Sequence, residues 1–168
     1  NALCLPPSDQ GSGQTSQIAG DFSNGPNAFP PEKGFPFGGL LAALAIKAMQ
    51  DQHEIETPIR TLSLQFLAAS KYEEPIDFDS RLLRAGRNVT YATVLAAQGD
   101  RIILNANGTF GMDKPWPSPS SDLRRPPPAI ETMKPGPGLH GPMAPRFTQY
   151  VDYRFETGPN ILGGNIGK

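Results

Sequence analysis

Apolar residues occupy nearly every position of residues 40–46, directly after Gly38 and Gly39. A run of this kind predicts a helix over about Gly38–Gln52. A surface helix shows a polar face, whereas this one has no charged residue before Lys47. We therefore expect a central helix that other structure covers on most sides. Ahead of Lys47 it offers no acid, histidine or nucleophile for chemistry.

Alternation of apolar and polar residues follows the helix four times and predicts four strands. In the clearest of them, Leu62, Leu64 and Phe66 alternate with polar residues. Gly99-Asp100 is a glycine-first signal for a two-residue hairpin between the last two strands. The predicted strands are Ile59–Leu67, Ile76–Ala85, Asn88–Gln98 and Arg101–Phe110.

Weaker alternation predicts one strand on each side of this block. The first is a short strand at Gln17–Ser23, before the helix. The second is Phe147–Phe155, after a tract that holds ten of the 19 prolines between Pro115 and Pro145. Proline has no backbone N–H to donate, so the tract is expected to be extended and outside any sheet.

Composition divides the 168 residues into four parts. We expect a flexible lead-in over residues 1–16 and one packed domain over residues 17–111. A proline-rich linker or strap then covers residues 112–146. Residues 147–168 are expected to hold the first strand of a second, incomplete unit.

Charge and cysteine content exclude several classes of function. Fifteen basic residues against sixteen acidic ones give a net charge of −1, which favours neither nucleic acid nor an anionic membrane as a partner. Cys4 is the single cysteine, so the sequence predicts no internal disulfide, no metal site and no cofactor. No apolar run is long enough to span a bilayer and no basic-then-apolar leader is present, so a reducing, cytoplasmic location is expected.

Four short motifs follow one another in the order of a known family. They are Phe37-Gly38-Gly39-Leu40, Leu62-Ser63-Leu64-Gln65-Phe66-Leu67, Leu83-Arg84-Ala85-Gly86-Arg87-Asn88 and Asn107-Gly108-Thr109-Phe110. Together, over about Ile18–Gly111, they resemble the first hotdog of the acyl-CoA thioesterase II (thioesterase-like) family. The resemblance implies an α+β hotdog fold, in which an antiparallel sheet wraps one long central helix. It also makes residues 147–168 the start of a second hotdog.

The resemblance carries expectations about activity and assembly. Members of that family are typically double hotdogs that hydrolyse fatty acyl-CoA to the free acid and CoA. In them an Asp on the second hotdog's helix, with Gln and Thr or Ser partners, orients the attacking water. This sequence has no counterpart of those residues, so no catalytic acid or base is assigned.

Two functions follow from these expectations. The first is an acyl-CoA thioesterase to which this chain supplies the first hotdog, forming a homodimer or higher oligomer through hotdog edges. The alternative is a non-catalytic hotdog that binds acyl ligands or serves in assembly.

Gly38 and Gly39 are the candidate backbone oxyanion donors. Free N–H groups at the start of a helix carry partial positive charge and can hold a developing oxyanion. Glycine also lets a ligand approach the backbone closely. The alternative is that the two glycines only let the preceding loop pass tightly beneath the sheet.

The candidate substrate-binding residues are Gln65, Arg87, Asn88 and Tyr91. The two arginines of Arg84–Asn88 flank a turn, where guanidinium groups could meet the phosphates of CoA. Alternatively, this segment is an ordinary hairpin with solvated charges. Gln65, Asn88 and Tyr91 either line an acyl groove or face solvent from their strands.

Other polar residues have structural interpretations. Asp77 and Asp79 share a strand face and are expected on a solvated edge. His53 and His140 lie far apart among loop residues, which argues against catalysis by either. Trp116, between two prolines, is expected to pin the strap onto the domain by burying its ring.

Overall fold

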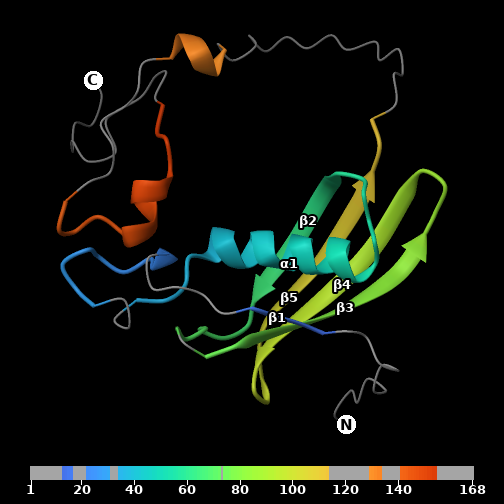
Figure 1. Ribbon diagram of the computed structural model, residues 1–168, viewed down its shortest axis with the longest axis horizontal. Coiled ribbons are helices and arrows are strands. Elements are labelled where there is room, and N and C mark those ends of the chain that lie inside the picture. The colour runs from blue at the N-terminus through green and yellow to red at the C-terminus, as the bar shows by residue number, and fades with distance from the viewer. Residues whose placement is uncertain are drawn as a thin grey trace, which may run out of the picture.

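The computed structural model describes residues 13–16, 22–30, 34–72, 74–113, 129–133 and 141–154. Within these ranges, helix α1 (Gly38–Gln52) lies against one face of an antiparallel sheet of five strands (Figure 1). The strands lie in the order β1-β3-β4-β5-β2, and two short 3-10 helices follow them along the chain. The bounds are β1 Gln14–Ser16, β2 Ile59–Phe66, β3 Ile76–Ala85, β4 Val89–Gln98, β5 Arg101–Gly111, η3 Ile130–Thr132 and η4 Arg146–Tyr150. This arrangement confirms the predicted hotdog fold.

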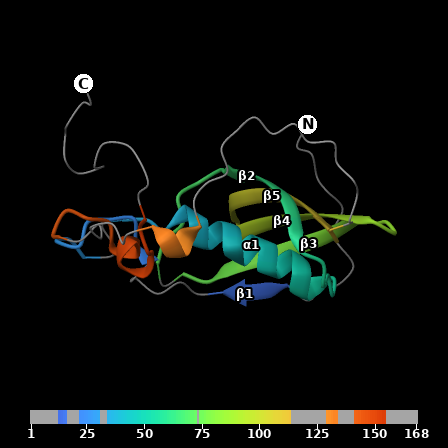
Figure 2. The ribbon, with the colours of Figure 1, turned by 90° about the horizontal axis from the view of Figure 1, so that it is seen from above.

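The helix and the four strands after it have the predicted bounds to within one residue at each end. The hairpin between β4 and β5 is also confirmed, because Gly99 has a φ of 56°. Glycine adopts this left-handed conformation at little cost, which explains why it opens the turn. Figure 2 shows α1 running along the sheet, with β1 at one margin.

The core lies between α1 and the face of the sheet that the helix covers. Helix residues at spacings of three and four are fully buried, as an amphipathic helix requires. They are Leu41, Ala45, Ala48 and Met49. On the sheet, the cross-strand row Leu64, Ala106, Val94 and Ser80 points to the helix, and the adjacent row, Gln65, Asn105, Leu95 and Asp79, points away from it.

The outer side of α1 is more open than its sequence suggests. Gly39, Ala43, Lys47 and Asp51 form an exposed stripe at spacings of four residues. A 2.8 Å ion pair joins Lys47 Nζ to Asp51 Oδ2 on this stripe. Small and charged residues therefore make up the part of the helix that the sheet leaves uncovered.

The first strand lies earlier than predicted. Gln14–Ser16 pairs with Ile76–Phe78, although these residues were expected in the flexible lead-in. Of the predicted strand at Gln17–Ser23, residues 17–21 lie outside the described ranges, and Ser23 forms only an isolated bridge with Pro36. The three polar residues of β1 pair mainly through their backbone, so no apolar alternation marks them in the sequence.

The strand predicted at Phe147–Phe155 is wrong in its described part, because Arg146–Tyr150 forms the 3-10 helix η4. Residues three apart share a face of a 3-10 helix. Phe147 and Tyr150 have this spacing, and each ring stacks on another aromatic ring, Phe37 and Phe22 respectively. Local stacking therefore determines the structure here. Whether residues 147–168 begin a second hotdog stays a prediction.

Candidate functional site

Helix α1 begins without a side-chain cap. The residue before its first turn is Phe37, in an extended conformation, and it offers no oxygen to the free N–H groups of the helix. Within the described residues, the N–H groups of Gly38 and Gly39 have no protein acceptor. Such groups carry the positive end of the helix dipole. The start of α1 therefore presents two free backbone donors.

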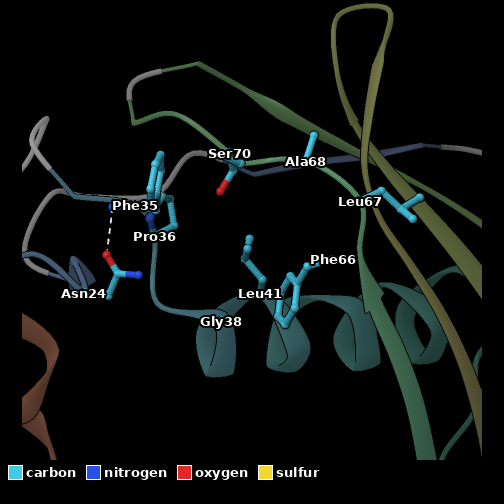
Figure 3. Close-up of a pocket in the computed structure, with 10 residues that line it drawn as sticks. Asn24, Phe35, Pro36, Gly38, Leu41, Phe66, Leu67, Ala68 and Ser70 are labelled. Carbon is cyan, nitrogen blue, oxygen red and sulfur yellow. Dashed lines mark hydrogen bonds between the residues drawn. The ribbon is translucent and has the colours of Figure 1, made fainter.

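A cavity of ≈ 410 Å³ opens beside these donors (Figure 3). Its walls come from the loop before α1, the first turn of α1, the end of β2 and the loop after β2. Most of the described lining is apolar, and it includes no acid, base or charged group. The lining residues are Asn24, Phe35, Pro36, Gly38, Leu41, Phe66, Leu67, Ala68, Ala69 and Ser70.

The two glycines have different surroundings, and the alternative that they only let the loop pass tightly beneath the sheet stays open. A Cβ at Gly38 would lie 2.9 Å from Cζ of Phe66, whose side chain is at the rim of the cavity and 56% exposed. A Cβ at Gly39 would overlap Cε1 of Phe37 and lie 2.6 Å from its Cζ. Gly38 thus opens onto the cavity, whereas Gly39 gives room to the Phe37 ring.

The segment 141–154 holds the loop that leads into α1. Phe147 stacks on Phe37 with ring centroids 3.9 Å apart and planes within 8° of parallel. Its N–H donates to the carbonyl of Ser23, and the Arg146 guanidinium donates to the carbonyl of Phe29 at 3.0 Å. Figure 1 shows this segment beside the N-terminal end of α1. More than a hundred residues separate the two partners in sequence, so only the fold brings them together.

Tyr72 is the described residue whose titration differs most clearly from its ordinary behaviour. Burial raises the pKa of its phenol, and the nearby Ser23 side chain and the charge of Arg146 oppose this effect. Ser23 is itself fully buried, and its hydroxyl accepts the N–H of Gly25 at 2.9 Å. This polar group lies behind the loop that shapes the cavity and serves to fix that loop.

The predicted phosphate-binding segment lies at the other end of the sheet. Arg87, Asn88 and Tyr91 line a cavity of ≈ 290 Å³ together with Arg84, at the hairpin between β3 and β4. The register aligns this hairpin with the end of β5 and the start of β2, whereas Gly38 lies next to the end of β2. The structure therefore brings Arg87, Asn88 and Tyr91 together, but apart from Gly38 and Gly39.

Gln65 joins neither group. It lies on the face of the sheet that points away from α1, opposite Asn105. The Asn105 amide donates to Oε1 of Gln65 at 3.5 Å, and the Gln65 side chain is exposed. Its neighbour Phe66 points to the helix side and lines the cavity instead. The sequence analysis selected the polar residue of this pair, whereas the residue that lines the cavity is the apolar one.

The opposite end of α1 holds a serine and a histidine in contact. His53 Nε2 lies 3.1 Å from Ser80 Oγ, and that hydroxyl donates to the carbonyl of Thr93 at 3.0 Å. Because the serine proton is already committed to a carbonyl, the histidine acts as donor to Ser80 and does not activate it. Acidic residues Asp51, Glu54 and Glu56 line a shallow depression nearby, where an anionic ligand would be repelled. This end of the helix is therefore a poor site for CoA.

Several residues from the sequence analysis can be placed only in part. Thr15 Oγ1 donates to Asp77 Oδ1 at 2.6 Å, and Asp77 is exposed, as expected of a sheet margin. Cys4, Trp116 and His140 lie outside the described residues. In the described ranges, no three His, Cys, Asp or Glu side chains gather as they would to hold a metal ion. No helix in those ranges has the length and apolar character needed to cross a membrane.

Comparison with known proteins gives one family. Residues 26–111, just over half of the chain, match the model of the acyl-CoA thioesterase N-terminal domain. A search of curated proteins found no match.

Solved structures extend the likeness to most of the chain. A hotdog-fold protein of unknown function from Alicyclobacillus acidocaldarius is 20% identical with a TM-score of 0.70, over 90% of this chain and 53% of that one. A candidate thioesterase from Novosphingobium aromaticivorans is 22% identical with a TM-score of 0.66, and the match covers 86% of this chain and 55% of that one. A hypothetical thioesterase from Streptococcus pneumoniae, solved with coenzyme A, is 17% identical with a TM-score of 0.50, over 58% and 75%.

At these identities the likeness establishes the hotdog fold. The chain spans about half the length of the first two structures.

Proposed function

Because the chain belongs to the family of the acyl-CoA thioesterase N-terminal domain, we propose that it forms the first hotdog of an enzyme that hydrolyses fatty acyl-CoA to the free acid and CoA. One observation carries the proposal: an apolar cavity opens directly at the uncapped N-terminus of α1. An acyl thioester has an apolar chain next to a carbonyl group. The cavity offers apolar walls next to free backbone donors, which is the matching arrangement.

In this proposal, the cavity binds the acyl chain and the start of α1 binds the carbonyl oxygen. Leu41, Phe66 and Leu67 provide apolar surface for the chain. The N–H groups of Gly38 and Gly39 donate to the carbonyl oxygen, whose negative charge grows as water attacks the carbon. Donors fixed before the reaction stabilise that charge, so they accelerate the step.

Hydrolysis also needs a group that takes a proton from the attacking water. The water oxygen bonds to the carbonyl carbon, the carbon–sulfur bond breaks, and the sulfur leaves as the thiolate or thiol of CoA. No acid or base lines the cavity in the described part of this chain. We therefore propose that a second hotdog, in the same polypeptide or in another subunit, supplies the carboxylate that orients the water.

The edge of the sheet next to the cavity is the proposed place for that second hotdog. Strand β2 pairs with β5 on one side, and its other edge has no partner among the described strands. Phe66 and Leu67, at the end of β2, are each 56% exposed. An open edge with apolar residues favours association, so we propose a homodimer or higher oligomer. Light scattering that shows a stable monomer would contradict this.

The hairpin between β3 and β4, which carries Arg84 and Arg87 and is called the arginine hairpin below, could contact CoA only in such an assembly. Arg84 and Arg87 are suited to the phosphates of CoA, but they lie at the far end of their own sheet from Gly38. The Streptococcus pneumoniae structure contains coenzyme A. We propose that the substrate of this protein is likewise a thioester of CoA. A cytoplasmic location is part of this proposal.

The test separates binding from turnover. We expect the 168-residue protein to bind S-octyl-CoA in calorimetry, and to release no thiol from octanoyl-CoA above the buffer rate. Phe66→Asp should weaken S-octyl-CoA binding, because a charge replaces apolar wall. Phe29→Asp is the matched control, since Phe29 is 48% exposed and is not part of the cavity.

Each result has a definite meaning for the proposal. Absence of S-octyl-CoA binding, or equal affinities for the two variants, would refute the acyl-CoA site at α1. Rapid thiol release by the protein would show that this chain contains its own catalytic group.

A further inference from the structure

Ser70 is a buried residue at the wall of the cavity. It is 4% exposed, and it follows β2 by four residues. Figure 3 shows its side chain directed from the loop into the cavity. Its hydroxyl makes no hydrogen bond with any residue that the structure describes. Its oxygen is not among the described side-chain atoms that are both fully buried and unpaired, so the cavity leaves it accessible to a ligand.

The backbone on both sides of Ser70 is held in place. Before it, the N–H groups of Leu67 and Ala68 donate to the carbonyl of Ile103, at 2.9 and 3.3 Å. After it, the N–H of Lys71 donates to Oε1 of Gln98 at 2.9 Å, and Nε2 of Gln98 donates back to the carbonyl of Lys71. Gln98 is itself 6% exposed. The backbone that carries Ser70 is therefore held by the sheet before any ligand arrives.

A second side-chain donor lies across the cavity. Asn24 Oδ1 accepts the N–H of Phe35 at 2.9 Å, which identifies the oxygen of this amide and leaves its NH₂ group to point toward the cavity (Figure 3). With the Gly38 N–H, three donors thus surround a cavity whose other walls are apolar. None of the described lining residues is a carboxylate that could accept hydrogen bonds from a ligand. The complementary ligand is an oxygen acceptor on an apolar chain.

We propose that Ser70 is a substrate-binding residue that donates a hydrogen bond to a carbonyl oxygen of bound acyl-CoA. This inference rests on the proposed function and names a contact beyond the glycine amides. Acyl-CoA offers this chemistry twice, in the thioester carbonyl and in the amide carbonyls of its pantetheine arm. The two sources differ in one respect, because only the first is lost when the acyl group is replaced by an alkyl group.

The experiment compares Ser70→Ala with the unaltered protein against two CoA ligands. One is a ketone analogue of hexanoyl-CoA, in which a methylene group replaces the thioester sulfur and the carbonyl remains. The other is S-hexyl-CoA, which has no acyl carbonyl. Ser63→Ala is the matched control, because Ser63 is an exposed serine of β2 on the face that points away from α1.

We expect Ser70→Ala to weaken binding of the ketone analogue by about 2- to 10-fold, the range for one neutral hydrogen bond. Its melting temperature should stay equal or rise, because no hydrogen bond within the described protein is lost. If S-hexyl-CoA binding is unchanged, the partner is the thioester carbonyl. If it weakens equally, the partner is a pantetheine carbonyl, which also supports the proposal.

Two outcomes would overturn the role of Ser70, and they can be told apart. If the unaltered protein binds both ligands and Ser70→Ala binds them equally well, the cavity stands as an acyl-CoA site and Ser70 has no part in binding. If the unaltered protein binds neither ligand, the proposed function fails and the role of Ser70 fails with it.

Discussion

Replacing Gly39 by alanine should destabilise the protein, whereas the same change at Gly38 should not. The two positions are adjacent and both lie in the first turn of α1. A Cβ at Gly38 meets the ring of Phe66, which is 56% exposed and free to rotate outward. A Cβ at Gly39 meets the ring of Phe37, which is stacked on Phe147 at a centroid distance of 3.9 Å. The second ring cannot move without losing that stack.

The magnitudes follow from two opposing effects. Alanine favours the helix over glycine by at most about 1 kcal/mol. An extra atom in a packed site costs about 1–3 kcal/mol when its neighbours cannot yield. Gly39→Ala should therefore lower the free energy of unfolding by about 1–2 kcal/mol. Gly38→Ala should leave it unchanged or raise it by up to about 1 kcal/mol.

Urea unfolding followed by circular dichroism measures both variants. For a chain of this size, about 1 kcal/mol corresponds to about 2–4 °C in melting temperature, so thermal melts provide a second measure. Phe147→Ala removes the stack and lets the Phe37 ring turn away. In that background Gly39→Ala should cost clearly less, which a double-mutant cycle detects. The stacking argument is refuted if Gly39→Ala is as stable as Gly38→Ala. It is also refuted if Gly39→Ala costs as much free energy of unfolding in the Phe147→Ala background as in the unaltered protein.

Two further predictions concern the core and the response to pH. Met49→Ala should lower the free energy of unfolding by about 2–5 kcal/mol, because Met49 is fully buried between α1 and the sheet. Met112→Ala, at a residue that is 66% exposed, should change it very little in the same urea assay. Similar losses in the two variants would contradict the assigned core. Burial raises the pKa of Tyr72 above its ordinary 10.0, so the unfolded chain releases that proton first and the free energy of unfolding falls as pH rises above about 10. Tyr72→Phe should reduce this fall between pH 8 and pH 10.5, and a fall equal to that of the unaltered protein would refute this assignment.

Local sequence patterns predicted the helix and the four long strands because each has a strong and continuous signal. The apolar run after Gly38 and Gly39 has helical length, and the strands alternate over eight to eleven residues. β1 escaped prediction because Gln14–Ser16 is three polar residues whose strand form depends on pairing with Ile76–Phe78. The alternation at Phe147–Phe155 misled for the opposite reason, since stacking on Phe22 and Phe37 outweighed it.

The sequence selected backbone donors at the start of α1, whose role stays a prediction, and it did not select the side chains that line the cavity. Gly38 and Gly39 were selected as donors, and the structure places free N–H groups there beside a cavity. Ser70 and Asn24 were not selected, because a single serine or asparagine in a loop has no distinctive pattern. The role proposed for Ser70 depends on its burial beside the Gln98 and Ile103 anchors, and Asn24, which is exposed, depends on its hydrogen bond with Phe35 for the direction of its amide.

The sequence alone therefore determined the helix, the four long strands and the family, since these are encoded in local patterns and in the order of short motifs. Only the tertiary structure decided which residues share the cavity at the start of α1. It set Phe66 toward the helix and Gln65 away from it, and it separated the arginine hairpin from Gly38 by the length of the sheet. The physical reason is that strand register and loop anchoring join residues that are far apart in sequence, and neither leaves a local signal.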